Sequence, residues 1–146
     1  MTDEILVRAA PIDDLAPRLL HELLRLRVDV FVVEQECAYP ELDTRDVEPG
    51  AVHLWTEADD GSVTAVARLL DDGDERRIGR IATRTDQRGA GLAARLIDVA
   101  IERSEGPWVL DAQAHLAGWY ERFGFVAEGH EFLEDGIPHV TMRRRV

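Results

Sequence analysis

Hydrophobic residues recur at two different periods along this chain, and the change of period separates expected helices from expected strands. From Leu15 to Val30, apolar residues return every three or four positions, which predicts an amphipathic helix. The same spacing predicts a second helix over 89–103 and a third over 114–122. The third helix is expected to end at Gly124.

Strand-like runs lie around these helices. Three consecutive runs, over 52–57, 62–70 and 76–84, are separated by Asp-Gly turns, which predict an antiparallel meander. The intervening segment 31–50 is rich in acids and contains two prolines, so we expect a partly helical turn followed by a long loop. Shorter strands are expected over 5–8, over 108–110, and after the turn at 134–136.

This order of elements predicts a mixed α/β fold, with one mainly antiparallel sheet and helices on both faces. A chain of 146 residues suits one compact domain, and no linker or repeat interrupts it. We therefore expect residues 1–146 to form a single domain.

Composition and charge narrow the classes of function. The net charge of −12 argues against nucleic acid as a partner, because phosphate contacts need a basic surface. It favours either a cationic substrate or no particular class of substrate. No apolar run is long enough to span a membrane, and the acidic start of the chain is unlike a secretory signal. We therefore expect a cytoplasmic protein without a membrane partner. The single cysteine, Cys37, excludes an internal disulfide and is expected to be a half-buried filler, and no metal-ligand spacing is present.

A glycine turn between the third meander strand and the second helix has the features of an anion site. Gly89 and Gly91 remove side chains where the helix presents unpaired amides and the positive end of its dipole. Five arginines crowd this stretch of an otherwise acidic chain, so we expect a locally positive field. These arginines are Arg76, Arg77, Arg80, Arg84 and Arg88. The turn lacks the lysine and hydroxyl residue of a P-loop and the full dinucleotide fingerprint, so it supports neither a nucleotide triphosphatase nor a nicotinamide enzyme.

Two motifs resemble the GCN5-related N-acetyltransferase (GNAT) superfamily. The run Arg88-Gly89-Ala90-Gly91-Leu92-Ala93 is similar to its coenzyme A pyrophosphate motif. In that motif an Arg or Gln is followed three residues later by Gly, and two residues after that by Gly or Ala. Further on, Tyr120 stands seven residues after Gln113 and before a Gly-Phe pair, where the family has a tyrosine seven residues after an asparagine. Gln113 departs from that asparagine but keeps an amide.

A set of separated motifs resembles the ElaA-like subfamily more closely, and it covers nearly the whole chain. The resemblance implies the GNAT-like acyl-CoA N-acyltransferase fold, a single N-acetyltransferase domain over 1–146, and acetyl-CoA as co-substrate without a metal. The motifs are residues 26–35, Cys37, Tyr39, Asp43, Asp46, His53, the pair Gly79-Arg80, and residues 134–139.

The resemblance also implies roles for particular residues. Tyr120 would protonate the departing thiolate, and Glu34, His53 or His139 would accept a proton from the incoming amine. Each of these three also has a structural alternative, as a cap, an ion-pair partner or a hydrogen-bonded histidine. The acids of 31–46, chiefly Glu34, Glu36, Glu41, Asp43 and Asp46, would attract a cationic acceptor. The implied cofactor-binding residues are Ile81, Ala82, Thr83, Arg88, Gly89, Ala90, Gly91, Leu92, Ala93 and Gln113.

Four functions remain open from the sequence. The first is an N-acetyltransferase acting on a small-molecule or peptide amine. The others are a catalytically idle coenzyme A sensor of the same fold, a related synthase of signalling lactones, and an acidic interaction domain without a small ligand. Exposed strand edges near the C-terminus are compatible with a homodimer.

Overall fold

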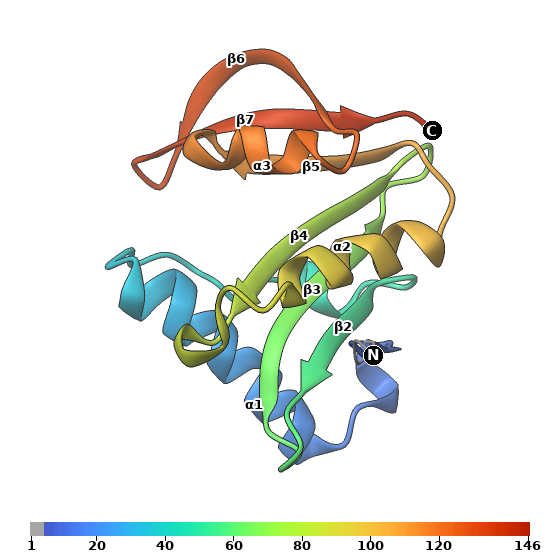
Figure 1. The fold of residues 1–146 in the computed structure, drawn as a ribbon, viewed down its shortest axis with the longest axis vertical. Coiled ribbons are helices and arrows are strands. Elements are labelled where there is room, and N and C mark those ends of the chain that lie inside the picture. The colour runs from blue at the N-terminus through green and yellow to red at the C-terminus, as the bar shows by residue number, and fades with distance from the viewer. Residues whose placement is uncertain (1–4) are drawn as a thin grey trace.

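A computed structural model describes residues 5–146 and contains one seven-stranded sheet with the strand order β1-β2-β3-β4-β5-β7-β6 (Figure 1). The acids at Asp3 and Glu4, used above to characterise the start of the chain, lie outside these residues. Neighbouring strands are antiparallel except β4 and β5, so the expected mixed α/β fold with a mainly antiparallel sheet is confirmed. The strands are β1 (Arg8–Ala10), β2 (Val52–Glu57), β3 (Val63–Asp71), β4 (Arg76–Thr83), β5 (Trp108–Gln113), β6 (Val126–Glu134) and β7 (Ile137–Arg144).

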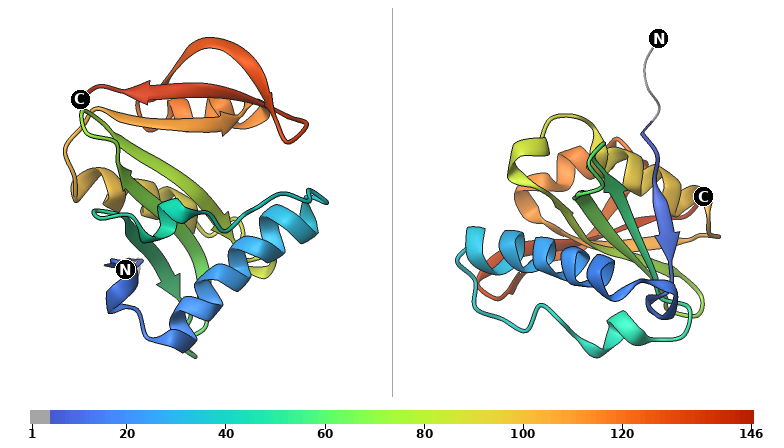
Figure 2. Two further views of the ribbon diagram at one scale, coloured as in Figure 1. Left: turned by 180° about the vertical axis from the view of Figure 1, so that it is seen from behind. Right: turned by 90° about the horizontal axis from the view of Figure 1, so that it is seen from below.

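Helices cover both faces of the sheet, as expected. They are α1 (Pro17–Val28), α2 (Leu92–Glu102) and α3 (Ala117–Glu121). Figures 1 and 2 show α1 and α2 on opposite sides of strands β2 to β4. Each helix buries its apolar stripe, with Leu23 and Leu26 facing inward from α1 and Leu96 and Ile97 from α2.

Strand β3 is the centre of the fold because both of its faces are covered. Val66 belongs to the core cluster under α1, whereas Ala65 and Ala67 belong to the cluster under α2. This alternation is the period of two that a strand requires. The cluster under α2 continues to β5, β7 and α3, where Phe125 and Met142 are fully buried.

Several element boundaries differ from the sequence expectations. The first helix starts at Pro17, because Ala16 is still extended, and it continues as a π-helix over Asp29–Glu34 where a turn was expected. Strand β1 begins three residues later than predicted. Strand β5 runs on to Gln113 because it pairs with β7 along its whole length.

Candidate functional site

Strands β4 and β5 pair only at their first residues and then diverge. The parallel register joins Arg76 to Trp108 and Arg77 to Val109 and stops there, and Figure 1 shows the two strands separating beyond that point. A cavity of about 740 Å³ occupies the opening, lined by β4, β5, α3, the π-helix and the turn between β6 and β7. Side chains of five separate elements and several titratable groups converge on this cavity, which makes it the candidate site.

Tyr120 closes the inner wall of this cavity. Its residue is only 9% exposed, and its hydroxyl has no hydrogen-bond partner among residues 5–146. Burial raises the pKa of Tyr120 to about 12, so the phenol keeps its proton at physiological pH. Trp119 packs edge-on against Tyr120 with the ring centroids 5.0 Å apart, and this contact fixes the orientation of the phenol. The hydroxyl oxygen is not among the buried unsatisfied atoms of the described residues, so it reaches the cavity, where it is a donor available to a ligand.

The glycine turn stands at the mouth of the cavity. Gly89 and Gly91 both have positive φ, +85° and +81°, and Gly91 is the residue that precedes the first turn of α2. Gly91 has no side chain with which to cap the helix, so the first amides of α2 have no side-chain partner from it. Arg88 and Ala93, at the two ends of the motif, line the cavity.

The expected positive field around this turn is wrong, because each of the five arginines has a carboxylate partner. Arg88, which lies in the turn itself, forms a bidentate ion pair with Glu34, with nitrogen–oxygen distances of 2.8 and 2.7 Å. Arg84 pairs with Asp86 at 2.6 Å. Arg76 pairs with Asp71, and Arg77 pairs with both Asp72 and Asp111. Arg80 pairs with Glu41 and Asp43.

Strand β4 contains a β-bulge where it borders the cavity. Arg68 on β3 pairs with Gly79, whereas Val66 pairs with Ala82, so two residues of β4 oppose one residue of β3. The two are Arg80 and Ile81, and Arg80 has a φ of +52°. The edge residues Ile81, Ala82 and Thr83 follow, and all three line the cavity.

The three candidate proton acceptors lie in different surroundings. His139 lines the cavity with a 12% exposed side chain, and its Nδ1 lies 2.7 Å from the carbonyl oxygen of Ile137. Since a carbonyl can only accept, Nδ1 is the donor and Nε2 is left with a lone pair when the ring is neutral. Glu34 also lines the cavity, but its hydrogen bond to Arg88 lowers its pKa, which weakens it as a base.

His53 lies outside the cavity. It is buried on β2, and its Nε2 is 3.0 Å from the carbonyl oxygen of Asp46. Burial lowers its pKa, so the ring is neutral and donates this hydrogen bond. The expectation that His53 takes part in the site finds no support in this placement, since its partner and its burial give it a structural role.

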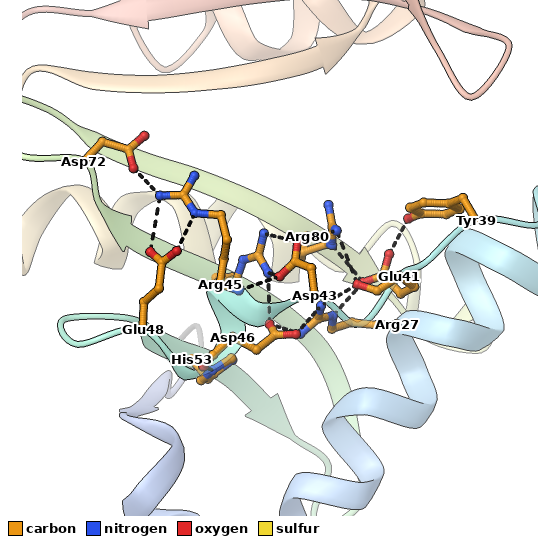
Figure 3. A network of polar contacts seen from close by, with 11 residues as sticks. Arg27, Tyr39, Glu41, Asp43, Arg45, Asp46, Glu48, His53, Asp72 and Arg80 are labelled. Atoms are coloured by element: carbon orange, nitrogen blue, oxygen red, sulfur yellow. Dashed lines mark hydrogen bonds and ion pairs between the residues drawn. The ribbon is translucent and has the colours of Figure 1, made fainter.

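The acidic segment does not form the expected acidic cleft for a cationic acceptor. Glu41 and Asp46 are buried and pair with Arg27, and Asp43 pairs with Arg68 and Arg80 (Figure 3). Glu34 pairs with Arg88 at the surface, so arginine partners neutralise most of the negative charge of this segment. The cavity carboxylates without an arginine partner among the described residues are instead Glu134 and Asp135, at the turn between β6 and β7.

The remaining predicted residues divide between the wall and its edge. Gln113 lines the cavity, and its side-chain amide donates to Oε1 of Gln35 at 3.4 Å. The sequence reasoning missed His115 and Cys37 as wall residues; Cys37 is half-buried as expected, and its thiol lies 3.6 Å from the carbonyl oxygen of Asp135. Residues Gly89, Ala90, Gly91 and Leu92 of the turn do not line the cavity.

Within residues 5–146, no group of three His, Cys, Asp or Glu side chains has a geometry that would hold a metal ion. No helix over the same residues has the length and apolar character needed to cross a membrane.

Comparisons with known proteins found related sequences over most of the chain. The family model described as "Acetyltransferase (GNAT) domain" matches residues 25–146. A UPF0039 protein of Mycobacterium tuberculosis is 52% identical over 136 residues, which cover 90% of this chain and 87% of the relative. The protein ElaA of Escherichia coli is 36% identical over 141 residues, covering 91% of this chain and 92% of ElaA.

Solved structures give the same result. An acyl-CoA N-acyltransferase from Pseudomonas aeruginosa superposes with a TM-score of 0.90 at 39% identity, covering 97% of this chain and 99% of that one. The crystal structure of E. coli ElaA superposes with a TM-score of 0.88, covering 97% of this chain and all of the ElaA chain. Acyl transfer from acyl-CoA is the chemistry that this family supports. The chain therefore belongs to the GNAT acetyltransferase family and, within it, to the group that includes ElaA.

Proposed function

We propose that this protein is an N-acetyltransferase that transfers the acetyl group of acetyl-CoA to an amine of a small molecule or peptide, by direct attack in a ternary complex. The observation that carries the proposal is the buried phenol of Tyr120, which faces the cavity without a partner among residues 5–146. A scaffold that only bound coenzyme A would not need a proton donor there. Acetyl-CoA, when bound, supplies the thioester whose acetyl carbon the amine attacks as the carbon–sulfur bond breaks.

The residues around the cavity fit an extended acyl-CoA. The edge of β4 at Ile81, Ala82 and Thr83 is free of β5, which pairs with β4 only at Arg76 and Arg77. Backbone groups on that edge can pair with the amides of a pantetheine arm as they would with another strand. The amides of 89–93 at the start of α2 suit the pyrophosphate.

The protein supplies two proton-handling groups for the reaction. Nε2 of His139 takes the proton that the amine nitrogen loses as the carbon–nitrogen bond forms. The hydroxyl of Tyr120 gives a proton to the sulfur as negative charge develops on it. A backbone amide at the bulge of β4 polarises the acetyl carbonyl by donating a hydrogen bond.

Replacing His139 by Gln should lower kcat by about 10- to 100-fold, at or below the lower end of the roughly 100- to 10,000-fold that a positioned base contributes, because water can partly substitute for it. The amide of Gln keeps a polar group near the carbonyl of Ile137 and removes the lone pair of Nε2. Added imidazole should restore part of the rate. A variant with unchanged kcat would show that another group, such as Glu34, accepts the proton.

Replacing Gly91 by Ala should weaken acyl-CoA binding by roughly 5- to 30-fold, because a residue with a Cβ pays about 1–2 kcal/mol in the left-handed region that Gly91 occupies. The new Cβ would meet no atom within 4 Å, so strain in the backbone is the whole effect. Titration calorimetry with coenzyme A measures it. Gly118→Ala is the matched control, since that glycine is helical, has no positive φ and also has open space around its Cβ. Equal affinities for the two variants would remove the turn from the binding site.

The experiment that tests the proposed function is a screen for coenzyme A release from acetyl-CoA. The panel should contain alkylamines, polyamines, amino acids and peptides with free N-termini, each measured against a reaction without acceptor. We expect at least one amine class to accelerate release, with the acetylated amine identified by mass spectrometry. Binding of acetyl-CoA without acceleration by any amine would favour the idle sensor instead, and an absence of binding would favour the interaction domain.

A further inference from the structure

The motif residues that the proposed mechanism does not use form a buried network of charges beside the cavity. Glu41 lies at its centre, with a side chain 2% exposed. One carboxylate oxygen of Glu41 lies 2.7 Å from Nε of Arg27 and 2.8 Å from Nε of Arg80, and the other accepts a hydrogen bond from the hydroxyl of Tyr39. Figure 3 shows these groups converging from α1, β4 and the loop after the π-helix. The network is not fully hydrogen-bonded, because Nε of Arg80 and Nε of Arg68 are buried without a hydrogen-bond partner in the described part of the chain. Charges are buried at a cost, which raises the question of what this network does for the site beside it.

Arg80 is the member of the network with an unusual backbone. It is the first bulge residue of β4 and has a φ of +52°, a region that residues with a Cβ occupy at a penalty. Bulges of this kind ordinarily have glycine at that position. A strained residue keeps such a conformation only where its surroundings hold it.

The surroundings hold the guanidinium of Arg80 from several sides. Nη2 donates to a carboxylate oxygen of Asp43 at 3.1 Å and to the carbonyl oxygen of Glu41 at 3.2 Å. The guanidinium carbon also lies 5.9 Å from the centre of the Tyr39 ring. Because these partners belong to the loop after the π-helix, the loop and the bulge are fixed to each other.

We propose that Arg80 is a positioning residue: its ion pairs with Glu41 and Asp43 hold the β4 bulge in its left-handed conformation, so that the backbone amides following it stay aimed at the acyl carbonyl. The inference rests on the proposed function and deepens it. It also gives the motif residues Tyr39 and Asp43 a role. Together with Glu41 they make the contacts that hold Arg80 in place, and we call this set of contacts the clamp. The side chain acts through its own backbone and donates no proton.

The test compares Arg80→Ala with Arg80→Gly. Both variants lose the guanidinium and leave the same carboxylates behind, so the difference between them isolates the backbone. Glycine adopts positive φ without penalty, whereas alanine has a Cβ and no longer has a clamp to hold it. We expect kcat with acetyl-CoA to be roughly 5- to 30-fold lower for Arg80→Ala than for Arg80→Gly, the factor that corresponds to the left-handed penalty, with similar KM for acetyl-CoA.

Thermal unfolding without any acyl-CoA gives a second, independent readout. We expect Arg80→Gly to unfold at a higher temperature than Arg80→Ala, the reverse of the usual order in a strand, where glycine is the less stable. The role of Arg80 would be overturned if Arg80→Ala matched or exceeded Arg80→Gly in both kcat and unfolding temperature. If the unfolding order holds but the wild-type protein transfers no acetyl group, the clamp stands and the proposed function fails.

Discussion

Replacing Tyr120 by Phe should lower kcat for acetyl transfer by about 100-fold or more, within the range that a positioned general acid contributes, while the affinity for acetyl-CoA stays nearly constant. The substitution removes one oxygen atom and keeps the ring that packs against Trp119. The hydroxyl has no partner among residues 5–146, so its loss leaves no other protein group unsatisfied. Steady-state kinetics gives kcat, and calorimetry gives the affinity.

Thr56→Val is a suitable control for that substitution. It also removes a buried hydroxyl, one that hydrogen-bonds to Thr64 at 2.7 Å, but neither threonine lines the cavity. A comparable loss of activity in the control would indicate a general effect of destabilisation. An unchanged rate in Tyr120→Phe would remove Tyr120 from the mechanism. Because burial raises the pKa of Tyr120 to about 12, a loss of wild-type activity near pH 10, the ordinary tyrosine value, would also contradict its assignment as the donor.

The parts of the fold that local sequence determines were predicted well. The meander β2 to β4 follows from alternating residues and Asp-Gly turns, both of which are short-range signals, and β2 has the predicted bounds. The π-helix over Asp29–Glu34 covers the end of the expected first helix and the partly helical turn expected after it, so the helical character was predicted and the wider π turn was not. Every residue of β6 except the partly buried Glu128 is exposed, so the strand lacks the alternation of buried and exposed residues that would have marked it in the sequence.

The glycine turn at 89–93 and Tyr120 could be named from sequence as candidate site residues because each belongs to a compact motif. The charge pairing around them could not be found in that way. Arg27 is 14 residues from Glu41, and Arg88 is 54 residues from Glu34. Residues at such separations meet only once the sheet has formed, so counts of charge along the chain predicted both an arginine-rich turn and an acidic cleft that the folded protein neutralises.

Replacing Arg27 by Met should lower the free energy of unfolding at pH 7 by about 3–5 kcal/mol, the cost of removing one partner from a buried ion pair. The Arg27 side chain is 3% exposed and contacts Glu41 and Asp46, each at 2.7 Å. Methionine fills a similar volume but leaves two carboxylates buried without this partner. Urea unfolding monitored by tryptophan fluorescence measures the change.

Arg25→Met is the matched control, because it is the same substitution two residues away on the exposed side of α1. The Arg25 side chain is 63% exposed, with carboxylates at 3.6 and 3.8 Å, so its loss should cost at most about 1 kcal/mol. Equal losses in the two variants would show that Arg27 contributes through helix propensity or packing instead of its charge.

The pH dependence gives the sign of the electrostatic part of this effect. Burial by itself would raise the pKa of Asp46, but its hydrogen bonds and ion pairs with Arg27 and Arg68 outweigh burial and hold the pKa below its ordinary value of 3.8. A carboxyl with a depressed pKa stabilises the fold above its ordinary pKa, and this stabilisation is lost as the pH falls through the folded-state value.

Without Arg27, the pKa of Asp46 rises toward or above the ordinary value, and protonation then relieves the buried charge. The gap in unfolding free energy between the wild type and Arg27→Met should therefore be largest near pH 7 and should narrow as the pH falls toward 4. A gap that stayed constant over that range would mean that Arg27 stabilises the protein by packing alone.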